Sequence, residues 1–198
     1  MEFDYDLASL QEARNLVRSA KRAQEVLKNF TQEQIDRIIR YMCEAGEAHA
    51  EDLAMMAVSE TGMGRFEDKC VKNFFASRYV YEYIKDMKTV GIIHEDPQNK
   101  VWEIAEPAGV IVGIVPTTNP TSTVIYKAMI ALKGRNAIVF SPHPSAVRCT
   151  NEAARLMHEA AMAAGAPEGI IGCMSNVTMG ATNELMKHPD TALILATG

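Results

Sequence analysis

The order of hydrophobic and polar residues divides the chain into a helical first half and a second half in which strands and helices alternate. In the first half, apolar residues recur every three or four positions, the period of amphipathic helices. We expect helices over residues 9–28, from Thr31 onward, and over residues 50–61 and 65–87. In the second half, "GVIVGIV" (residues 109–115) is almost continuously apolar, as in a strand covered on both faces.

The helix starts carry local signals. Ser9 with Glu12 has the spacing of a capping box, and so does Thr31 with Gln34, where Phe30 can also staple onto the helix. The first helix has apolar positions at Leu10, Leu16, Val17 and Val26, and the second should turn Ile35, Ile38, Ile39 and Met42 inward. The third should end at "TGMG", where Gly62 or Gly64 can adopt the left-handed conformation.

The fourth helix carries an aromatic stripe at helical spacing. Such a stripe is more typical of a core or a subunit contact than of a ligand site. Its members are Val71, Phe74, Phe75, Ala76, Tyr79 and Tyr83.

The period changes after the helical half. "VWEIAEP" alternates apolar and polar residues, which predicts a half-exposed antiparallel strand. Strands are then expected over residues 109–115, 137–141, 170–174 and 191–196, separated by helices over 120–132, 145–164 and 178–187. This alternation predicts an α/β fold: a helical segment followed by a parallel sheet with helices on both faces. Because the chain stops at "ALILATG", where a further helix would be expected, we interpret it as the front part of something longer.

Composition and charge disfavour several classes of binding partner. The chain has 198 residues, 47% hydrophobic and 23% charged, with a net charge of −5, which is ordinary for a globular protein and disfavours nucleic acids and anionic membranes. The acidic N-terminus is no secretory signal, and no apolar run approaches the length of a membrane span. The four cysteines lack zinc-site spacing, so we expect inert thiols in a reducing cytoplasm and no metal.

Polar residues gather where the predicted parallel strands end, and ligands bind beyond the carboxyl ends of such strands. These ends read "VPTTNPT", "FSPHP", "MSNVTMG" and "LATG", with neither a GxGxxG motif nor a P-loop. Taken alone, "TTNPT" is more typical of a helix cap than of a reaction site. His143 between two prolines has the pattern of a solvated side chain, and the other four histidines that of surface residues.

Several stretches together resemble the CoA-acylating branch of the aldehyde dehydrogenase superfamily. They are "FTQEQIDRI", "SETGMG", "EDKCVKNFFAS", "IAEPAGVIVGIVPTTNPTST", "KGRNAIVFSPHP", "AAGAPEGIIG" and "HPDTALILATG". The resemblance implies a helical segment over 1–88, strands of the oligomerisation-hairpin type over 89–108, and a partial Rossmann-like nucleotide-binding domain over 109–198. The catalytic domain of the family would be absent.

The resemblance also implies a reaction. A cysteine thiolate attacks an aldehyde, hydride passes to NAD, and CoA takes the acyl group from the enzyme thioester. An asparagine amide helps to stabilise the oxyanion. We favour Asn119 for this donor, although gapless counting back from Asn136 puts Thr118 at the family's asparagine position. The expected cofactor-binding residues are Val115, Pro116, Thr117, Ser141, Pro142, His143, Pro144, Thr197 and Gly198.

Two departures from the family pattern shape the expectations. Ser141 and Pro144 stand where hydrolytic relatives carry a lysine and a glutamate that bind the adenosine ribose, so tolerance of NADP beside NAD is expected. The family's catalytic cysteine lies downstream of "ILATG". A matching motif is found at none of the four cysteines of this chain, which are Cys43, Cys70, Cys149 and Cys173. We therefore expect this chain alone to be inactive.

The resemblance leaves other matters open. The aldehyde is small, but acetaldehyde, propionaldehyde, sulfoacetaldehyde and succinate semialdehyde are all compatible with it. We expect a homo-oligomer in the full-length enzyme, in the cytoplasm or in a bacterial microcompartment, where a shell contact through the N-terminal helix is an alternative to core packing. A non-catalytic oligomerisation or interaction module derived from this fold is the competing hypothesis.

Overall fold

Four parallel strands form the centre of the structure. The computed structural model describes residues 4–197. Its larger sheet has the spatial order β5-β4-β3-β6, and every neighbouring pair is parallel. The strands are β3 (Val110–Val115), β4 (Ala137–Pro142), β5 (Ile171–Cys173) and β6 (Thr191–Ala196). The predicted parallel sheet is confirmed.

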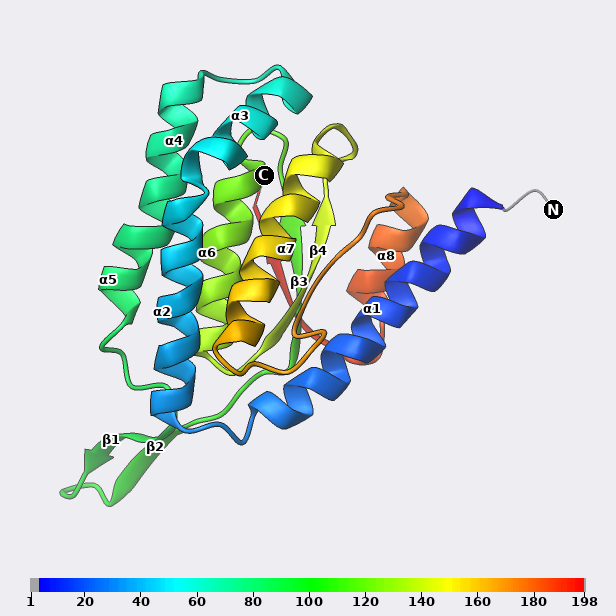
Figure 1. Ribbon diagram of the computed structural model, residues 1–198. Helices are drawn as coiled ribbons and strands as arrows, with labels where there is room; N and C mark the ends of the chain where they lie inside the picture. The colour runs from blue at the N-terminus through cyan, green and yellow to red at the C-terminus, as the bar shows by residue number, and fades with distance from the viewer. Residues whose placement is uncertain (1–3, 198) are drawn as a thin grey trace.

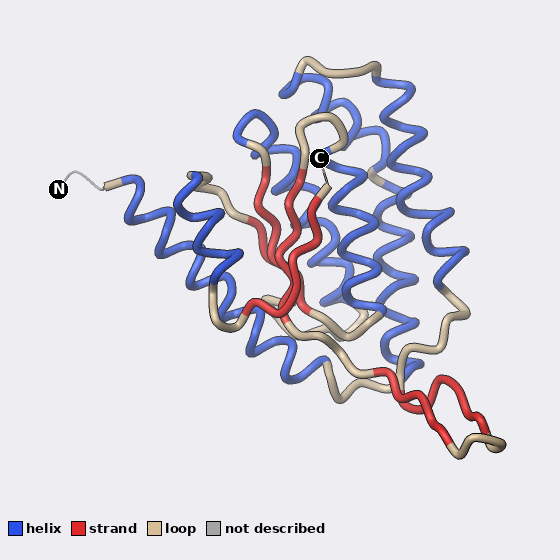
Figure 2. Tube along the Cα trace, turned by 180° about the vertical axis from the view of Figure 1, so that it is seen from behind, coloured by secondary structure: helices blue, strands red, loops and turns tan. Residues whose placement is uncertain are grey.

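Helices lie on both faces of this sheet (Figures 1 and 2). One face is covered by α1 (Tyr5–Leu27) and α8 (Met179–Lys187), which pack against each other. The other is covered by α6 (Pro120–Lys133) and by α7 (Val147–Ala163), which the short helix η2 (Pro144–Ala146) precedes.

A further helical layer packs outside α6 and α7. It consists of α2 (Gln32–Ala48), α3 (Ala50–Thr61), α4 (Phe66–Phe74), the π-helical turn η1 (Phe75–Tyr79) and α5 (Val80–Ile84). Buried side chains of α1, α2, the sheet and its covering helices belong to one hydrophobic core. Among residues 4–197 no helix is long and apolar enough to cross a membrane.

Two of the predicted helix signals are confirmed. At α2, Thr31 Oγ1 accepts from Gln34 N while the Gln34 side chain accepts from Thr31 N, and the four expected apolar residues of this helix are fully buried. The helix α3 ends at Gly62, whose φ of 64° is the left-handed conformation that glycine adopts without a Cβ clash.

The expected capping box of the first helix is wrong. The helix α1 begins at Tyr5, and its N-cap is Asp4, whose carboxylate accepts from the backbone amides of Asp6 and Leu7. Ser9 and Glu12 instead reach the loop between β5 and α8, far away in the sequence. Local spacing alone does not distinguish a capping pair from two side chains that bind a distant loop.

The aromatic stripe lies mostly on the surface, so the core alternative is wrong and a subunit contact stays a prediction. The fourth helix is not uniform, because η1 interrupts it, and the side chains of Phe75, Tyr79 and Tyr83 are 60%, 63% and 75% exposed. Val71 and Phe74 are exposed as well, and of the stripe only Ala76 is buried. The inward face carries polar residues, namely Lys69, Asn73 and Ser77. This segment is therefore an amphipathic helix whose polar face turns toward the body of the molecule.

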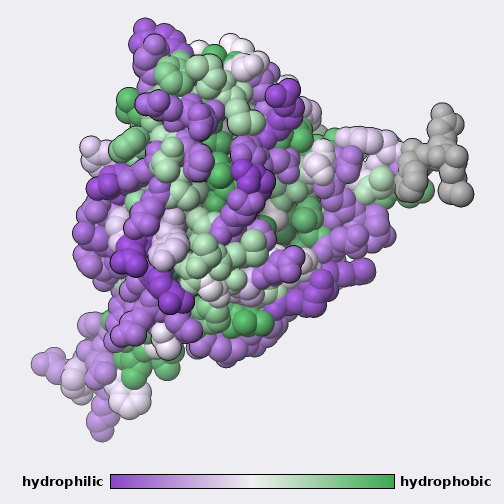
Figure 3. Space-filling model, in the orientation of Figure 1, coloured by the Kyte–Doolittle hydropathy of each residue, from purple (hydrophilic) through white to green (hydrophobic). Residues whose placement is uncertain are grey.

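A two-stranded hairpin projects from the body (Figure 1). Its strands β1 (Gly91–Asp96) and β2 (Val101–Ala105) pair in antiparallel fashion, as expected for β2. The expected half-burial of β2 is wrong, because no layer of the described chain covers the hairpin and Trp102 is 66% exposed. In the space-filling view, green hydrophobic surface lies near the hairpin at the lower left (Figure 3). The exposed hydrophobic side chains of the hairpin also include Ile93, Val101 and Ile104.

A test of the core concerns the packing of β3 against β4. In Gly113→Ala, the new Cβ would lie 2.7 Å from Cδ1 of the fully buried Phe140, too close for carbon atoms. We expect a loss of about 1–3 kcal/mol in the free energy of unfolding, measured by urea denaturation. Gly180→Ala in the exposed first turn of α8 is the control, since the nearest atom is 3.8 Å away, and it should be neutral or stabilising. Equal stability of the two variants would contradict the packing described.

Candidate functional site

The carboxyl ends of three strands meet at one edge of the sheet. Because β3 pairs with both β4 and β6, Val115 lies opposite Pro142 and Ile114 opposite Ala196. The backbone N–H of His143 also donates to the carbonyl of Val115 at 3.1 Å. The structure thus brings together the predicted segments 115–119, 141–144 and 197. The predicted residue Gly198 lies outside the described residues.

Asn119 occupies the N-cap position of α6, but its side chain does not cap the helix. Its Oδ1 accepts a hydrogen bond from Nζ of Lys72 at 2.9 Å, and its Nδ2 contacts Oγ1 of Thr118 at 3.3 Å. The capping interpretation of "TTNPT" therefore does not describe this amide.

A recess of about 420 Å³ lies beside this amide. One wall is apolar and comes from α4 and η1, where Val71 and Phe75 are exposed. Polar groups line the recess as well, and among them the hydroxyl groups of Tyr126 and Thr197 lie 3.1 Å apart. The lining residues are Val71, Lys72, Phe75, Ala76, Asn119, Ser122, Thr123, Tyr126 and Thr197.

The other predicted cofactor residues at this edge differ in exposure. Val115 and Pro142 are buried, Pro116 is partly buried, and Pro144 is exposed. The hydroxyl of Ser141 is already paired with Oγ1 of Thr182 at 2.8 Å. Their role in binding a cofactor stays a prediction.

Thr117 and His143 contrast in their surroundings. Oγ1 of Thr117 is buried and has no hydrogen-bond partner among residues 4–197. Buried hydroxyls are normally paired, so this one could respond to a bound ligand. The exposed His143 has Nδ1 accepting from Ser145 N, which caps η2.

The sequence matches a family model over residues 3–198, and the model is described as the aldehyde dehydrogenase family. The chain belongs to the aldehyde dehydrogenase family. The resemblance to this superfamily inferred from the sequence is thereby confirmed.

Similar proteins and solved structures include aldehyde-alcohol, acetylating aldehyde and propionaldehyde dehydrogenases. The bifunctional aldehyde-alcohol dehydrogenase AdhE of Escherichia coli K12 is 51% identical over 97% of this chain and 22% of its own length. An acetylating aldehyde dehydrogenase from Geobacillus thermoglucosidasius is 60% identical, with a TM-score of 0.98 over 100% of this chain and 44% of that one. A propionaldehyde dehydrogenase from a Clostridium phytofermentans fucose utilisation bacterial microcompartment is 35% identical, with a TM-score of 0.83 over 94% and 42%. The chain thus spans between about a fifth and under half of the relatives' lengths.

Two other similar structures contain ligands. An engineered glycolyl-CoA reductase with bound NADP+ is 30% identical, with a TM-score of 0.81 over 94% of this chain and 42% of that one. A Rhodopseudomonas palustris propionaldehyde dehydrogenase with bound propionyl-CoA is 30% identical, with a TM-score of 0.82 over 94% and 41%. Nicotinamide and CoA ligands are thus found on this aldehyde dehydrogenase fold.

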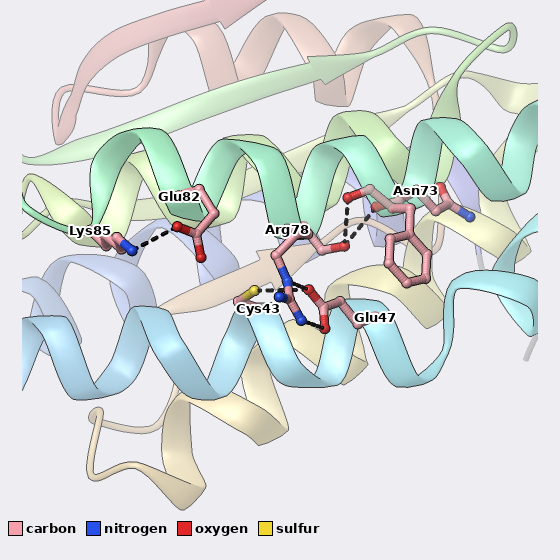
Figure 4. Close-up of polar contacts among 8 residues, drawn as sticks. Cys43, Glu47, Asn73, Arg78, Glu82 and Lys85 are labelled. Carbon is pink, nitrogen blue, oxygen red and sulfur yellow. Dashed lines mark hydrogen bonds and ion pairs between the residues drawn. The ribbon is translucent and has the colours of Figure 1, made fainter.

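The cysteines of this aldehyde dehydrogenase chain have no sign of activation. Burial, followed by the charge of Glu47, raises the pKa of Cys43 to about 12, and the close-up shows this thiol beside the Glu47–Arg78 ion pair (Figure 4). Burial, followed by Glu60, raises the pKa of Cys149 to about 12. Burial also raises the pKa values of Cys70 and Cys173. A nucleophilic cysteine needs the opposite shift.

Metal ligands and histidines give no second candidate. Among the described residues, no group of three His, Cys, Asp or Glu side chains is placed to hold a metal ion.

His158 and His188 were expected at the surface, and this expectation is wrong. Nε2 of the half-buried His158 accepts from Gly169 N, and Nδ1 of the buried His188 accepts from Asp190 N. Both imidazoles serve local loop structure.

The loop after β5 is held by the first helix. The Glu12 carboxylate accepts from the backbone and the side chains of both Ser175 and Asn176. Burial acts to raise the pKa of Glu12, but these hydrogen bonds outweigh it and the pKa is lowered. Sequence reasoning missed this role because the partners are more than 160 residues apart.

A buried lysine lies directly beneath the edge, and it was also missed. Nζ of Lys127 donates to the carbonyls of Ile114 (2.8 Å) and Leu195 (2.6 Å), so it joins β3 and β6 just before the recess. The side chain is fully buried, and burial lowers its pKa to about 8. A lysine within the apolar run "VIYKAMIAL" was the available signal.

The depressed pKa of Lys127 predicts a pH dependence of stability. Below pH 8 both the folded and unfolded chains carry the ammonium, and burying it is costly. Between about pH 8 and 10.5 only the unfolded chain is protonated, so folding stability should rise with pH. Lys127→Met lacks this titrating group. Over this pH range, the unfolding free energy of wild type should therefore increase by up to about 3 kcal/mol relative to that of Lys127→Met. A difference that is flat or falls with pH would contradict the burial of the ammonium.

The raised thiol pKa values predict slow alkylation. At pH 7.5, Cys43 and Cys149 should react with iodoacetamide at least about 100-fold more slowly than free cysteine, because so little thiolate is present. Site-resolved mass spectrometry measures the rates, and the urea-unfolded chain, in which all four thiols should react, is the control. Any thiol of the folded chain that outpaces free cysteine would reveal an activated nucleophile.

Proposed function

We propose that this chain supplies the N-terminal portion of an NAD-dependent, CoA-acylating aldehyde dehydrogenase. The reaction is aldehyde plus NAD plus CoA to acyl-CoA plus NADH. The observation that carries the proposal is the Asn119 amide, which is free of any capping role and borders a recess at the carboxyl edge of the sheet. The similarity to acetylating enzymes supports the same reaction class.

In this proposal the Asn119 amide donates to the oxygen that becomes negative when a thiolate adds to the aldehyde carbonyl. A preorganised donor of this kind contributes typically about 3–4 kcal/mol to transition-state stability. Lys69 and Lys72 make the surroundings of Asn119 positive, and so does the N-terminus of α6. The raised pKa values of all four thiols support a nucleophilic cysteine outside this chain. This chain alone is therefore proposed to be inactive.

Asn119 is preferred to Thr118 as the donor. Asn119 lines the recess, whereas the exposed hydroxyl of Thr118 accepts the contact from the Asn119 amide. The recess volume of about 420 Å³ suits a small aldehyde rather than an entire dinucleotide.

A nicotinamide cofactor held at this edge would supply the hydride acceptor for the oxidation. The residues proposed to hold it are those of the sheet edge predicted above, with the unpaired hydroxyl of Thr117 and the hydroxyl of Thr197 as polar contacts. CoA is proposed as the acyl acceptor, and NADP is proposed to be tolerated. The setting proposed is the cytoplasm, with a bacterial microcompartment as the alternative.

The projecting hairpin is proposed to mediate homo-oligomerisation. Trp102 and Ile104 are 66% and 57% exposed on β2. Large exposed apolar side chains on an otherwise polar arm are typical of an interface.

A chimeric enzyme tests the catalytic proposal. This chain replaces the matching region of the Geobacillus thermoglucosidasius enzyme, to which it is 60% identical, and NADH formation from acetaldehyde and CoA is followed at 340 nm. We expect activity in the chimera, none in this chain alone, and a kcat reduced about 100- to 1,000-fold by Asn119→Ala.

Two controls accompany it. Thr118→Ala should have a much smaller effect than Asn119→Ala, and Asn29→Ala, at the far end of α1, should have none. An inactive chimera that folds, or an Asn119→Ala variant with unchanged kcat, would count against the proposal.

A further inference from the structure

Three side chains of the α4 helix contact the turn that carries Asn119. Nζ of Lys69 donates to the backbone carbonyl of Thr118 at 3.0 Å, and Nζ of Lys72 donates to Oδ1 of Asn119 at 2.9 Å. In the first turn of α6, Oγ1 of Thr121 donates to Oδ1 of Asn73 at 2.8 Å. The helix therefore holds the backbone before Asn119, the Asn119 side chain and the first turn of α6.

The anchors beneath the turn are buried. Lys69 is 5% exposed and Asn73 is 1% exposed, and Nδ2 of Asn73 donates to the carbonyl of Ala50 at 2.9 Å. Burial, together with the charge of Lys72, lowers the pKa of Lys69. Placing an ammonium there is costly, so its contact with the Thr118 carbonyl is a constraint that the fold keeps at some expense in stability.

The contact with Lys72 determines which way the amide of Asn119 points. An ammonium has three donors and no acceptor, so the atom facing it must be Oδ1 rather than Nδ2. Nδ2 then points away with one long contact, to Thr118 Oγ1, and a second hydrogen that no residue among 4–197 accepts. An amide that is to donate to an oxyanion requires this arrangement, in which its oxygen is held and an N–H group is left to donate.

The same contact changes the strength of the donor. Hydrogen bonds from a charged group are stronger than neutral ones, and a bond to the oxygen of an amide polarises its N–H groups. With Lys72 on Oδ1, the Nδ2–H groups become better donors than those of a free asparagine.

We propose that Lys72 is a positioning residue that orients and polarises the Asn119 amide toward the recess, on a turn anchored by Lys69 and Asn73. The identity of the acceptor as an oxyanion rests on the proposed function, whereas the orientation of the amide does not. Lys72 was not among the residues singled out from the sequence, where it lies within "EDKCVKNFFAS".

Nuclear magnetic resonance of the ¹⁵N-labelled chain tests the orientation without any turnover. The side-chain NH₂ pair of Asn119 is assigned by its loss in Asn119→Ala. In Lys72→Met, which keeps the length of the stem but removes the donor, the pair should move upfield and its two protons should draw closer together. Lys72→Arg retains a donor and should restore most of the wild-type shifts. Lys88→Met, a change at an exposed lysine away from the turn, is the matched control and should leave the pair unmoved.

The outcomes are distinct. A pair that is unchanged in Lys72→Met, or an arginine variant that behaves like the methionine variant, overturns the proposal. Because Lys72 is exposed, the fold should survive, and unchanged backbone resonances in the sheet verify this.

Kinetics of the chimera test the catalytic consequence. Lys72→Met should lower kcat about tenfold with little change in the KM for CoA, and adding it to Asn119→Ala should cost nothing more, since the two act as a unit. An unchanged kcat, or additive losses, would overturn the link to the oxyanion. If the chimera has no activity, the proposed function fails, and the resonance experiment still decides whether Lys72 sets the amide.

Discussion

The row of hydrogen bonds between α4 and the start of α6 is the constraint that joins the two halves of the molecule at the candidate site. Buried polar groups are stable only when they are paired, so Lys69 and Asn73 can be buried only if α6 and the turn before it stay in register with α4. Apolar contacts in the core are non-directional, so by themselves they do not fix the direction of a polar side chain. These hydrogen bonds fix distance and direction. They therefore place the helical layer against the sheet at the point where the chemistry is proposed.

The sheet supplies the second part of the site through its strand order. The central position of β3 brings the ends of β4 and β6 to its two sides, although the segments are separated by whole helices in the sequence. Gly113 permits the close approach of Phe140 that this packing requires. Lys127 then binds the last carbonyls of β3 and β6 together. Most residues that line the recess lie on α4, η1 and α6, and Asn119 and Thr197 directly adjoin α6 and β6.

Sequence periodicity predicted those elements whose partners are local or non-specific. The capping box at Thr31, the left-handed Gly62 and the buried strand "GVIVGIV" depend on neighbouring residues or on general burial, and all are confirmed. Ser9 and Glu12 met the same local criterion and failed, because their donors and acceptors are in the loop after β5. The position of the candidate site followed from a general rule about parallel sheets. The same rule did not predict that Lys72 and Tyr126 belong to the candidate site. Both residues lie on helices, and the sequence did not show which face of each helix turns toward the site.

The orientation of α4 explains why Lys72 was missed from the sequence and why the recess has an apolar wall beside a cation. A hydrophobic stripe on a helix normally turns toward the core. Here the polar row is the one turned inward, because it has specific partners on α6, and the stripe is left outside. The consequence is that one helix contributes to the recess in two ways. Lys72 binds the amide of Asn119, while Val71 and Phe75, one turn apart on the adjoining face, form the apolar wall next to it. Were α4 turned as its hydrophobicity suggests, the site would lose both the cation that orients the donor and the surface against which a small apolar substrate could rest.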